Sequence, residues 1–184
     1  MAYDIGAHVG KISKIFSMNF RDVFAFEPAE ESFEILRKLG DPKIKSFNIA
    51  ISDKDGFIAL DVRSEQISKR QLVDPGTTAL DWGNVIGKRL VPALTLDSLY
   101  ETLPPPDFVK IDTEGSEVRI LRGGAQVVAK SQATIFVEIH SEQNGREVVG
   151  VLEKNHSVQI IRHPGHSEGS SGWLNHYFVL ARHN

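Results

Sequence analysis

Short apolar runs alternate along the chain with stretches whose apolar residues recur at helical spacing, and no fixed repeat period separates them. The short runs are typical of buried strands, and the longer stretches are typical of amphipathic helices. The runs predicted as strands are Ala2–Ile5, Asp22–Phe26, Ile44–Ile51, Phe57–Val62, Val91–Leu94, Phe108–Asp112, Thr134–His140, Val158–Ile161 and Tyr177–Leu180. The predicted helices are Lys11–Asn19, one that starts at Pro28 and is closed by Gly40, a short one from a Thr95 cap to Tyr100, Glu117–Lys130 and Arg146–Lys154.

This alternation of strands and helices indicates a mainly parallel sheet that is covered by helices on both faces. The last two predicted strands follow each other without a helix, so they can pair only as an antiparallel hairpin at the edge of the sheet. The 184 residues suffice for one domain with a sizeable core but are too few for two comfortable domains. We therefore expect one α/β domain over residues 1–184, with a Rossmann-like sheet of seven strands.

A glycine-containing turn, Asp-Ile-Gly-Ala-His-Val-Gly at positions 4–10, follows the first predicted strand. Open α/β sheets bind ligands at such turns, where Gly6 and Gly10 let the backbone approach a ligand closely. The nicotinamide fingerprint Gly-x-Gly-x-x-Gly is absent. The carboxylate of Asp4 would repel a diphosphate but attract the amino group of S-adenosylmethionine (SAM). The charge therefore favours SAM, and Gly6→Val is expected to abolish SAM binding while the fold largely survives.

A second acidic residue, Glu27, ends the next predicted strand. It follows the glycines by about 20 residues, the position at which an acid binds ribose hydroxyls in such folds. The structural alternative is a solvated acid at a strand end, or a charge at a helix N-terminus. Because Glu27 occurs together with Asp4, Gly6 and Gly10, we favour the interpretation that it binds a ribose. His8, in the glycine turn, is expected only to line the site.

Five stretches of the chain resemble the FkbM-type methyltransferase family, a branch of the class I SAM-dependent enzymes. In order and spacing they span nearly the whole chain, and the stretch around Lys110–Glu117 is the most specific to this family. The matching stretches are Asp4–Gly10, Phe26–Pro28, Asn48–Asp53, Leu94–Leu99 and Val109–Glu117, with a weaker match at Val137–His140.

The resemblance implies a Rossmann-like class I methyltransferase fold and methyl transfer from SAM, usually to oxygen, in small-molecule or glycan pathways. The antiparallel ending is also that of a methyltransferase sheet rather than of a dinucleotide dehydrogenase. By position, the resemblance places Asp4, Gly6 and Gly10 at the methionine part of SAM and Glu27 at the ribose. Within the matched motifs, the remaining expected cofactor-binding residues are Ala7, Pro28 and the pair Ala50 and Ile51, which would flank the adenine.

Members of this family usually carry chain before the first motif, whereas only three residues precede Asp4 here. A missing N-terminal segment, or a homodimer in which a partner chain covers this region, would fit this difference. Two other classes of function stay open: a catalytically silent SAM-binding or oligomerisation module, and an NAD-dependent oxidoreductase. The missing third glycine and the antiparallel ending weaken the oxidoreductase alternative.

Candidate residues for chemistry lie at the ends of two later strands. Asp112 ends one strand, while Glu138 and His140 end the next and share a face because they are two apart. Asp112 or His140 could act as the general base that removes the proton of an acceptor hydroxyl. Alternatively, all three could bind a divalent cation such as Mg²⁺, which we do not favour. The structural alternative has Glu138 paired with Lys110.

Composition and net charge limit the kinds of binding partner that we expect. The net charge of −3 argues against a broad nucleic-acid surface, and the lack of cysteine fits a reducing compartment. No apolar run approaches the ~20 residues of a membrane helix, and the start of the chain shows no charged-then-apolar leader. We expect a cytoplasmic protein with a small-molecule or glycan acceptor and neither a nucleic acid nor a membrane as partner. Residues 53–106 and 163–172 are expected to shape the acceptor pocket.

Overall fold

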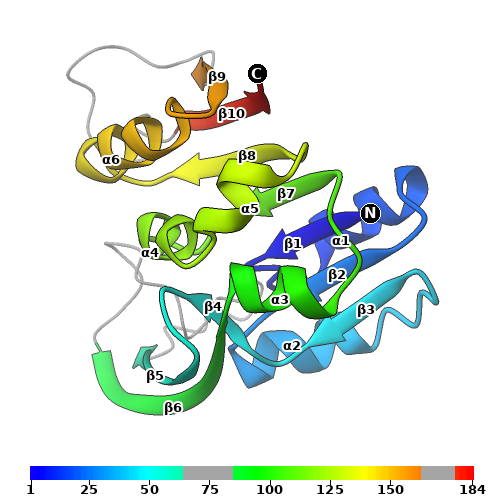
Figure 1. Cartoon of the computed structure of the whole chain (residues 1–184). Coiled ribbons are helices and arrows are strands. Elements are labelled where there is room, and N and C mark those ends of the chain that lie inside the picture. The colour runs from blue at the N-terminus through cyan, green and yellow to red at the C-terminus, as the bar shows by residue number, and fades with distance from the viewer. Residues whose placement is uncertain (64–84, 163–176) are drawn as a thin grey trace.

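The computed structural model describes residues 1–63, 85–162 and 177–184, and its centre is a seven-stranded sheet in the order β3-β2-β1-β7-β8-β10-β9 (Figure 1). The first five strands in this order are parallel, and β10 runs antiparallel to both β8 and β9. The predicted fold class and the antiparallel C-terminal hairpin are thus confirmed. The bounds are β1 Ala2–Ile5, β2 Val23–Phe26, β3 Ile44–Phe47, β7 Phe108–Ile111, β8 Thr134–Ile139, β9 His156–Arg162 and β10 Tyr177–His183.

The helices form two layers. The crossover from β1 to β2 and the crossover from β7 to β8 run in opposite directions across the sheet, so right-handed connections place their helices on opposite faces. The two helices that connect β1, β2 and β3 are α1 (Lys11–Asn19) and α2 (Glu30–Arg37). The other layer is formed by α3 (Leu96–Thr102), α4 (Glu117–Arg122), α5 (Ala125–Lys130) and α6 (Glu142–Leu152). No helix in the described ranges combines the length and apolarity that spanning a membrane requires.

The predicted strand Ile44–Ile51 is wrong as a single element. β3 ends at Phe47, and Ala50–Ser52 forms a separate strand, β4, in a second sheet of order β4-β6-β5. The cause lies at Asn48, whose side-chain amide donates to the carbonyl oxygens of Glu27 and Pro28 at 2.9 and 3.2 Å. This turn ties β3 to the end of β2. The other strands of the second sheet are β5 (Gly56–Arg63) and β6 (Val85–Thr95).

The predicted helix Glu117–Lys130 is likewise two helices, α4 and α5, separated by Gly123 and Gly124. A Cβ on Gly123 would lie 2.1 Å from the carbonyl oxygen of Ser52, so only glycine allows the end of α4 to approach the second sheet this closely. By contrast, the predicted cap is confirmed, because the Thr95 hydroxyl accepts a hydrogen bond from the Ser98 amide at the start of α3.

Strand alternation decides which side chains reach the site. On β8, Ile135, Val137 and Ile139 are fully buried in the core, where each apolar side chain stabilises the fold by roughly 1.5–3 kcal/mol. The alternate positions, among them Glu138, point to the opposite face and are half-buried. The hydrophobic core therefore fixes the orientation of the polar residues at the carboxyl ends of β7 and β8.

Candidate functional site

The glycine turn folds tightly against the end of β7. Gly6 has a φ of 73°, and a Cβ built on it would lie 1.8 Å from the backbone carbonyl oxygen of Asp112. The space beside Gly6, predicted from the sequence to be open to a ligand, is filled by the backbone at the end of a neighbouring strand. Gly6 is therefore required by the fold itself, and the expectation that Gly6→Val would leave the fold intact is wrong.

Gly10 ends the same turn and lies directly before α1, with a φ of 83°. A Cβ at this position would lie 2.6 Å from the side chains of Leu36 and Leu39, so the glycine lets α1 approach the end of α2. Ala7, between the two glycines, is buried among the residues that pack under α2. The turn is thus held by packing on both sides.

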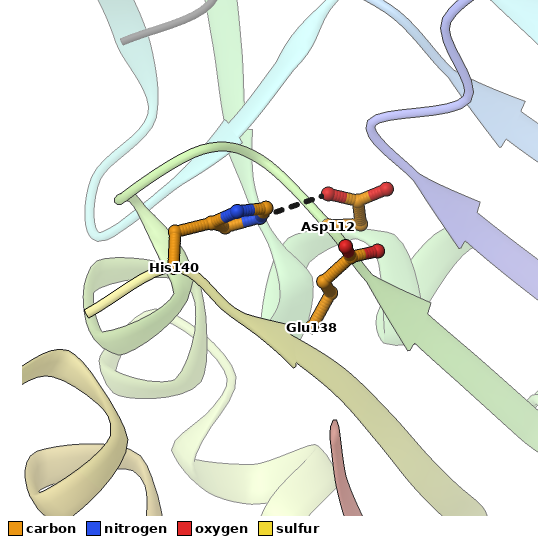
Figure 2. A group of neighbouring side chains, drawn as sticks. All are labelled: Asp112, Glu138 and His140. Atoms are coloured by element: carbon orange, nitrogen blue, oxygen red, sulfur yellow. Dashed lines mark hydrogen bonds and ion pairs between the residues drawn. The ribbon is translucent and has the colours of Figure 1, made fainter. Parts of the chain in front are cut away.

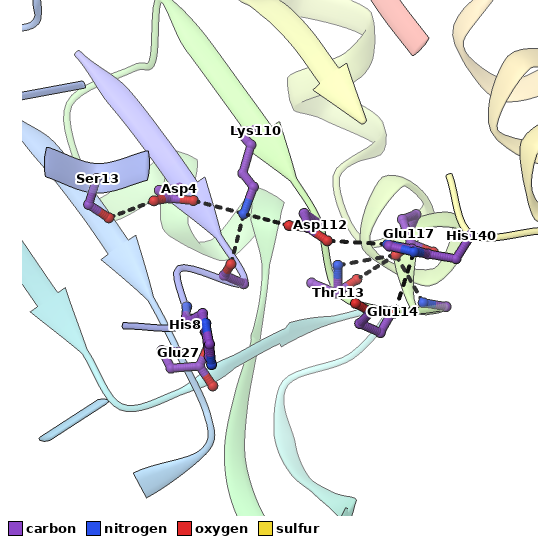
Figure 3. Close-up of polar contacts among 12 residues, drawn as sticks. Asp4, His8, Ser13, Glu27, Lys110, Asp112, Thr113, Glu114, Glu117 and His140 are labelled. Atoms are coloured by element: carbon purple, nitrogen blue, oxygen red, sulfur yellow. Dashed lines mark hydrogen bonds and ion pairs between the residues drawn. The ribbon is translucent and has the colours of Figure 1, made fainter. Parts of the chain in front are cut away.

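Glu27 joins the end of β2 to the glycine turn. Its side chain is 2% exposed, and its two carboxylate oxygens accept hydrogen bonds from the backbone amides of His8 and Ala29, both at 2.8 Å. Figure 3 shows Glu27 beside His8 under the turn. The structure therefore places a fixed carboxylate next to the glycines, as the ribose prediction requires. The contact of Glu27 with a ribose stays a prediction.

The other residues predicted to bind the cofactor, Pro28, Ala50 and Ile51, differ in how deeply they are buried. Pro28 is half-buried and follows Glu27 directly. Ala50 and Ile51 are each 5% exposed on β4, where Ala50 packs in the core of the second sheet and Ile51 in the main core. Their role beside an adenine stays a prediction.

A buried ion-pair chain connects Asp4 to Asp112. Asp4 is fully buried, accepts a hydrogen bond from the Ser13 hydroxyl at 2.5 Å, and lies 3.1 Å from Lys110 Nζ (Figure 3). Lys110 Nζ lies 3.3 Å from Asp112 and donates to the Gly6 carbonyl oxygen at 2.8 Å. Burial alone would lower the pKa of Lys110, but Asp4 and Asp112 raise it above its ordinary value. Lys110 therefore stays charged and compensates both carboxylates.

This role of Lys110 was not predicted from the sequence, which suggested Lys110 only as a partner for Glu138. The structure pairs Lys110 with the two aspartates instead. The signal in the sequence was a charged residue inside the apolar run Phe108–Ile111, since a buried charge needs a partner. The Asp4 carboxylate already faces Lys110 and Ser13. Its predicted contact with the SAM amino group would therefore add to these two contacts, and it stays a prediction.

Asp112 and His140 come together as predicted. His140 Nε2 lies 3.2 Å from Asp112, and its Nδ1 lies 3.4 Å from Glu114 (Figure 3). Burial lowers the pKa of His140, but the hydrogen bond to Asp112 and the charge of Glu114 outweigh it and raise this pKa to about 9. Burial raises the pKa of Asp112, but the bond to His140 and the charge of Lys110 lower it to about 2. The pair is thus an imidazolium and a carboxylate at neutral pH.

Glu117 holds the turn that follows Asp112 and contains Glu114. It is fully buried at the start of α4, and one of its carboxylate oxygens accepts hydrogen bonds from the Thr113 amide and hydroxyl and the Gly115 amide. The other oxygen accepts one from Asn144 at 2.5 Å. In this turn Glu114 has a φ of 56°, a region that side chains other than glycine rarely adopt. Glu117 therefore positions Glu114 and is a structural residue.

Glu138 lies beside the pair without joining it (Figure 2). One ligand atom each from Asp112, Glu138 and His140 lie within 4.8 Å of one another, so the three could offer ligands to a cation. Burial and the charge of Asp112 raise the pKa of Glu138 to about 7. Lys110 and the protonated His140 already pair with Asp112, so the charge of Asp112 is compensated without a cation. The predicted segment 163–172 and part of 53–106 lie outside the described residues.

The fold resembles solved methyltransferase structures. The FkbM methyltransferase from Methylobacillus flagellatus superposes with a TM-score of 0.64 at 12% identity, over 97% of this chain and 42% of that one. Precorrin-6y C5,15-methyltransferase from Geobacter metallireducens superposes with a TM-score of 0.59 at 15% identity, over 100% of this chain and 79% of that one. At these identities the likeness establishes the fold, which is that of the class I methyltransferases.

The sequence comparisons specify the family. Residues 4–163 match the methyltransferase FkbM domain, and the chain belongs to this family. A curated relative, the hexuronic acid methyltransferase AglP of Haloferax volcanii, is 26% identical over 169 residues. The aligned region covers 87% of this chain and 64% of AglP, so the chain spans less than two thirds of that relative. The resemblance inferred from the motifs is confirmed.

Proposed function

We propose that the chain transfers the methyl group of SAM to a hydroxyl group of a small molecule or glycan. Membership of the FkbM family supports the use of SAM. The observation that carries the proposal is the proximity of two preformed regions: the Glu27 carboxylate beside the glycine turn, and the Asp112–His140 pair at the end of the neighbouring strands. Lys110 connects the two regions through Gly6 and Asp112.

The residues of the glycine turn fit SAM. Glu27 is held by two backbone amides, so its carboxylate is oriented before any ligand arrives, and a carboxylate is a suitable hydrogen-bond acceptor for ribose hydroxyls. The turn leads into the N-terminus of α1, and the ion pair of Asp4 with Lys110 lies behind it. When bound, SAM supplies an electrophilic methyl group on a positively charged sulfur.

The acceptor end provides positioning and charge. The protonated His140, held by Asp112 and Glu114, can donate a hydrogen bond to an acceptor oxygen or stabilise negative charge on it. It already holds its proton, which argues against the general-base role that sequence analysis offered for it. The low pKa of Asp112 makes this residue a weak base as well.

AglP supports a glycan among the acceptors, because its name assigns it methyl transfer to a hexuronic acid. A hexuronic acid carries both hydroxyl groups and a carboxylate. In this chain Asp112, Glu114 and Glu138 surround the acceptor end with negative charge, which disfavours an anionic acceptor group and favours a neutral hydroxyl. A cytoplasmic location and a homodimer remain predictions.

Two measurements test this function. Titration calorimetry should detect SAM binding at micromolar concentrations and no comparable binding of NAD. Release of S-adenosylhomocysteine should then rise above the background with at least one member of a panel of sugars, uronic acids and hydroxylated small molecules. We expect this release with and without added magnesium. SAM binding without turnover on any panel member would favour a silent SAM-binding module, and binding of NAD alone would favour an oxidoreductase.

A further inference from the structure

Among the acidic side chains at the acceptor end, Glu138 differs from its neighbours in its contacts. Asp112 pairs with both Lys110 and His140, while Glu114 pairs with His140. Glu138 forms no hydrogen bond or ion pair with any described residue, although it is half-buried. Its carboxylate therefore keeps its full capacity to accept a proton or a hydrogen bond.

The buried neighbours of Glu138 in β8 orient its side chain toward the face of the sheet on which Asp112 and His140 lie. Ile139 and Val137, on either side of it in β8, are fully buried, so the Glu138 side chain points to the opposite face with His140 (Figure 2). On β10, Phe178 is directly opposite Glu138 in the register and stacks on Phe136 with ring centroids 5.1 Å apart. These stacked rings lie on the same face of the sheet as Glu138 and present no charged group to it.

We propose that Glu138 is the catalytic residue that accepts the proton of the acceptor hydroxyl, an inference that rests on the proposed function. The acceptor oxygen forms a bond to the methyl carbon while the carbon–sulfur bond breaks. The electron pair of that bond stays on sulfur and leaves neutral S-adenosylhomocysteine. The hydroxyl proton passes to the Glu138 carboxylate, so charge and atoms balance.

The electrostatics agree with this role. The charged groups that face Glu138 are Lys110 from β7, Asp112 and Glu114 from the turn that follows β7, and His140 directly after β8. The opposite residue on β10 is the uncharged Phe178. Burial and the carboxylates outweigh the cations and raise the pKa of Glu138 to about 7. A base is most effective when its pKa lies near the working pH, so Glu138 suits this task better than Asp112.

A base at this position also bears on which chemical class of acceptor the site can take. Methylation of a carboxylate acceptor needs no base, because the attacking oxygen is already an anion. A neutral hydroxyl does need one, and Glu138 provides it in a place that would repel a second carboxylate. The inference therefore assigns the enzyme a hydroxyl acceptor on a sugar or small molecule rather than an acid to be esterified.

A titration that needs no acceptor tests the proposal first. In protein labelled with carbon-13 at the glutamate carboxyl carbons, NMR from pH 4 to 9 should show one carboxyl group with a midpoint near 7. This signal should be absent from Glu138→Gln and present in the matched control Glu153→Gln, which changes an exposed glutamate. A midpoint below 5 for Glu138 would overturn the proposal.

Measurement of turnover then distinguishes the proposed role of Glu138 as a base from the proposed methyltransferase function. With any panel hydroxyl that the parent methylates, Glu138→Gln should lose roughly 10²–10⁴-fold in rate and retain its SAM affinity. It should also lose the rise in rate that the parent shows as pH increases through 7. Full turnover in Glu138→Gln would overturn the proposal and leave the methyltransferase function standing. Absent SAM binding in the parent would remove the function, and parent turnover that chelator abolishes and magnesium restores would replace the base with a metal site.

Discussion

Two parts of the candidate site differ in one respect: the acidic residues on the predicted cofactor side have internal partners, whereas Glu138 on the proposed acceptor side has none among the described residues. On the cofactor side, Asp4 is ion-paired and hydrogen-bonded, and both oxygens of Glu27 accept backbone amides. On the acceptor side, Glu138 is half-buried with no such contact in the described chain. This difference agrees with two separate roles. The fold orients Asp4 and Glu27 in advance, whereas the carboxylate of Glu138 keeps its capacity to accept a proton.

The glycine turn should show the largest effect of any single substitution considered. Gly6→Ala places a Cβ against the Asp112 carbonyl oxygen at a positive φ, so we expect the free energy of unfolding to fall by about 4–5 kcal/mol. Urea unfolding measures this change. The control Gly150→Ala, in α6 where nothing lies within 4 Å, should be neutral or slightly stabilising. A normally stable Gly6→Ala protein would break the claim that the turn is packed rather than open.

Lys110 comes next, because it is the connection between the two sides. Lys110→Met leaves Asp4 fully buried without its cation, so we expect a loss of about 3–4 kcal/mol at neutral pH. Urea unfolding at pH 7 measures this loss, and a Lys110→Met protein as stable as the parent would contradict the pairing.

His140 should give the smallest effect on stability, with a defined pH window. Its folded pKa of about 9 lies above the unfolded value of 6.5, so the stability it contributes is fully present below pH 6.5 and is lost as the pH rises through 9. We expect ~2 kcal/mol across this window, reduced by its partial exposure. Thermal unfolding of the parent should show this decline between pH 7 and 9, and His140→Gln should lack it. Parallel curves for the two proteins would mean that His140 is neutral in the fold.

Periodicity predicted the sheet well because buried strands and amphipathic helices leave a pattern in neighbouring residues. It failed where distant residues decide an element. The break between β3 and β4 depends on Asn48 reaching the carbonyl oxygens at the end of β2, and the break after α4 depends on Gly123 meeting Ser52. In each case the partner lies far away in the sequence, and local spacing carries no record of it.

The candidate site divides in the same way. The residue types of Asp112 and His140 and their positions at strand ends were enough to predict that they meet. Their protonation was not predictable, because it depends on Glu114 and Lys110, which reach the pair only through the turn and the neighbouring strand. For the same reason Glu138 could not be separated from a structural acid until the partner of Lys110 was known.

The division between a cofactor side and an acceptor side is tested most directly by calorimetric titration of SAM into the parent, Glu27→Gln and Glu138→Gln under identical conditions. Loss of the charged acceptor at Glu27 should cost about 1.5–3 kcal/mol, which corresponds to roughly 10- to 150-fold weaker binding. Glu138→Gln should bind SAM as tightly as the parent. Equal weakening in both variants, or unchanged binding in Glu27→Gln, would contradict the account.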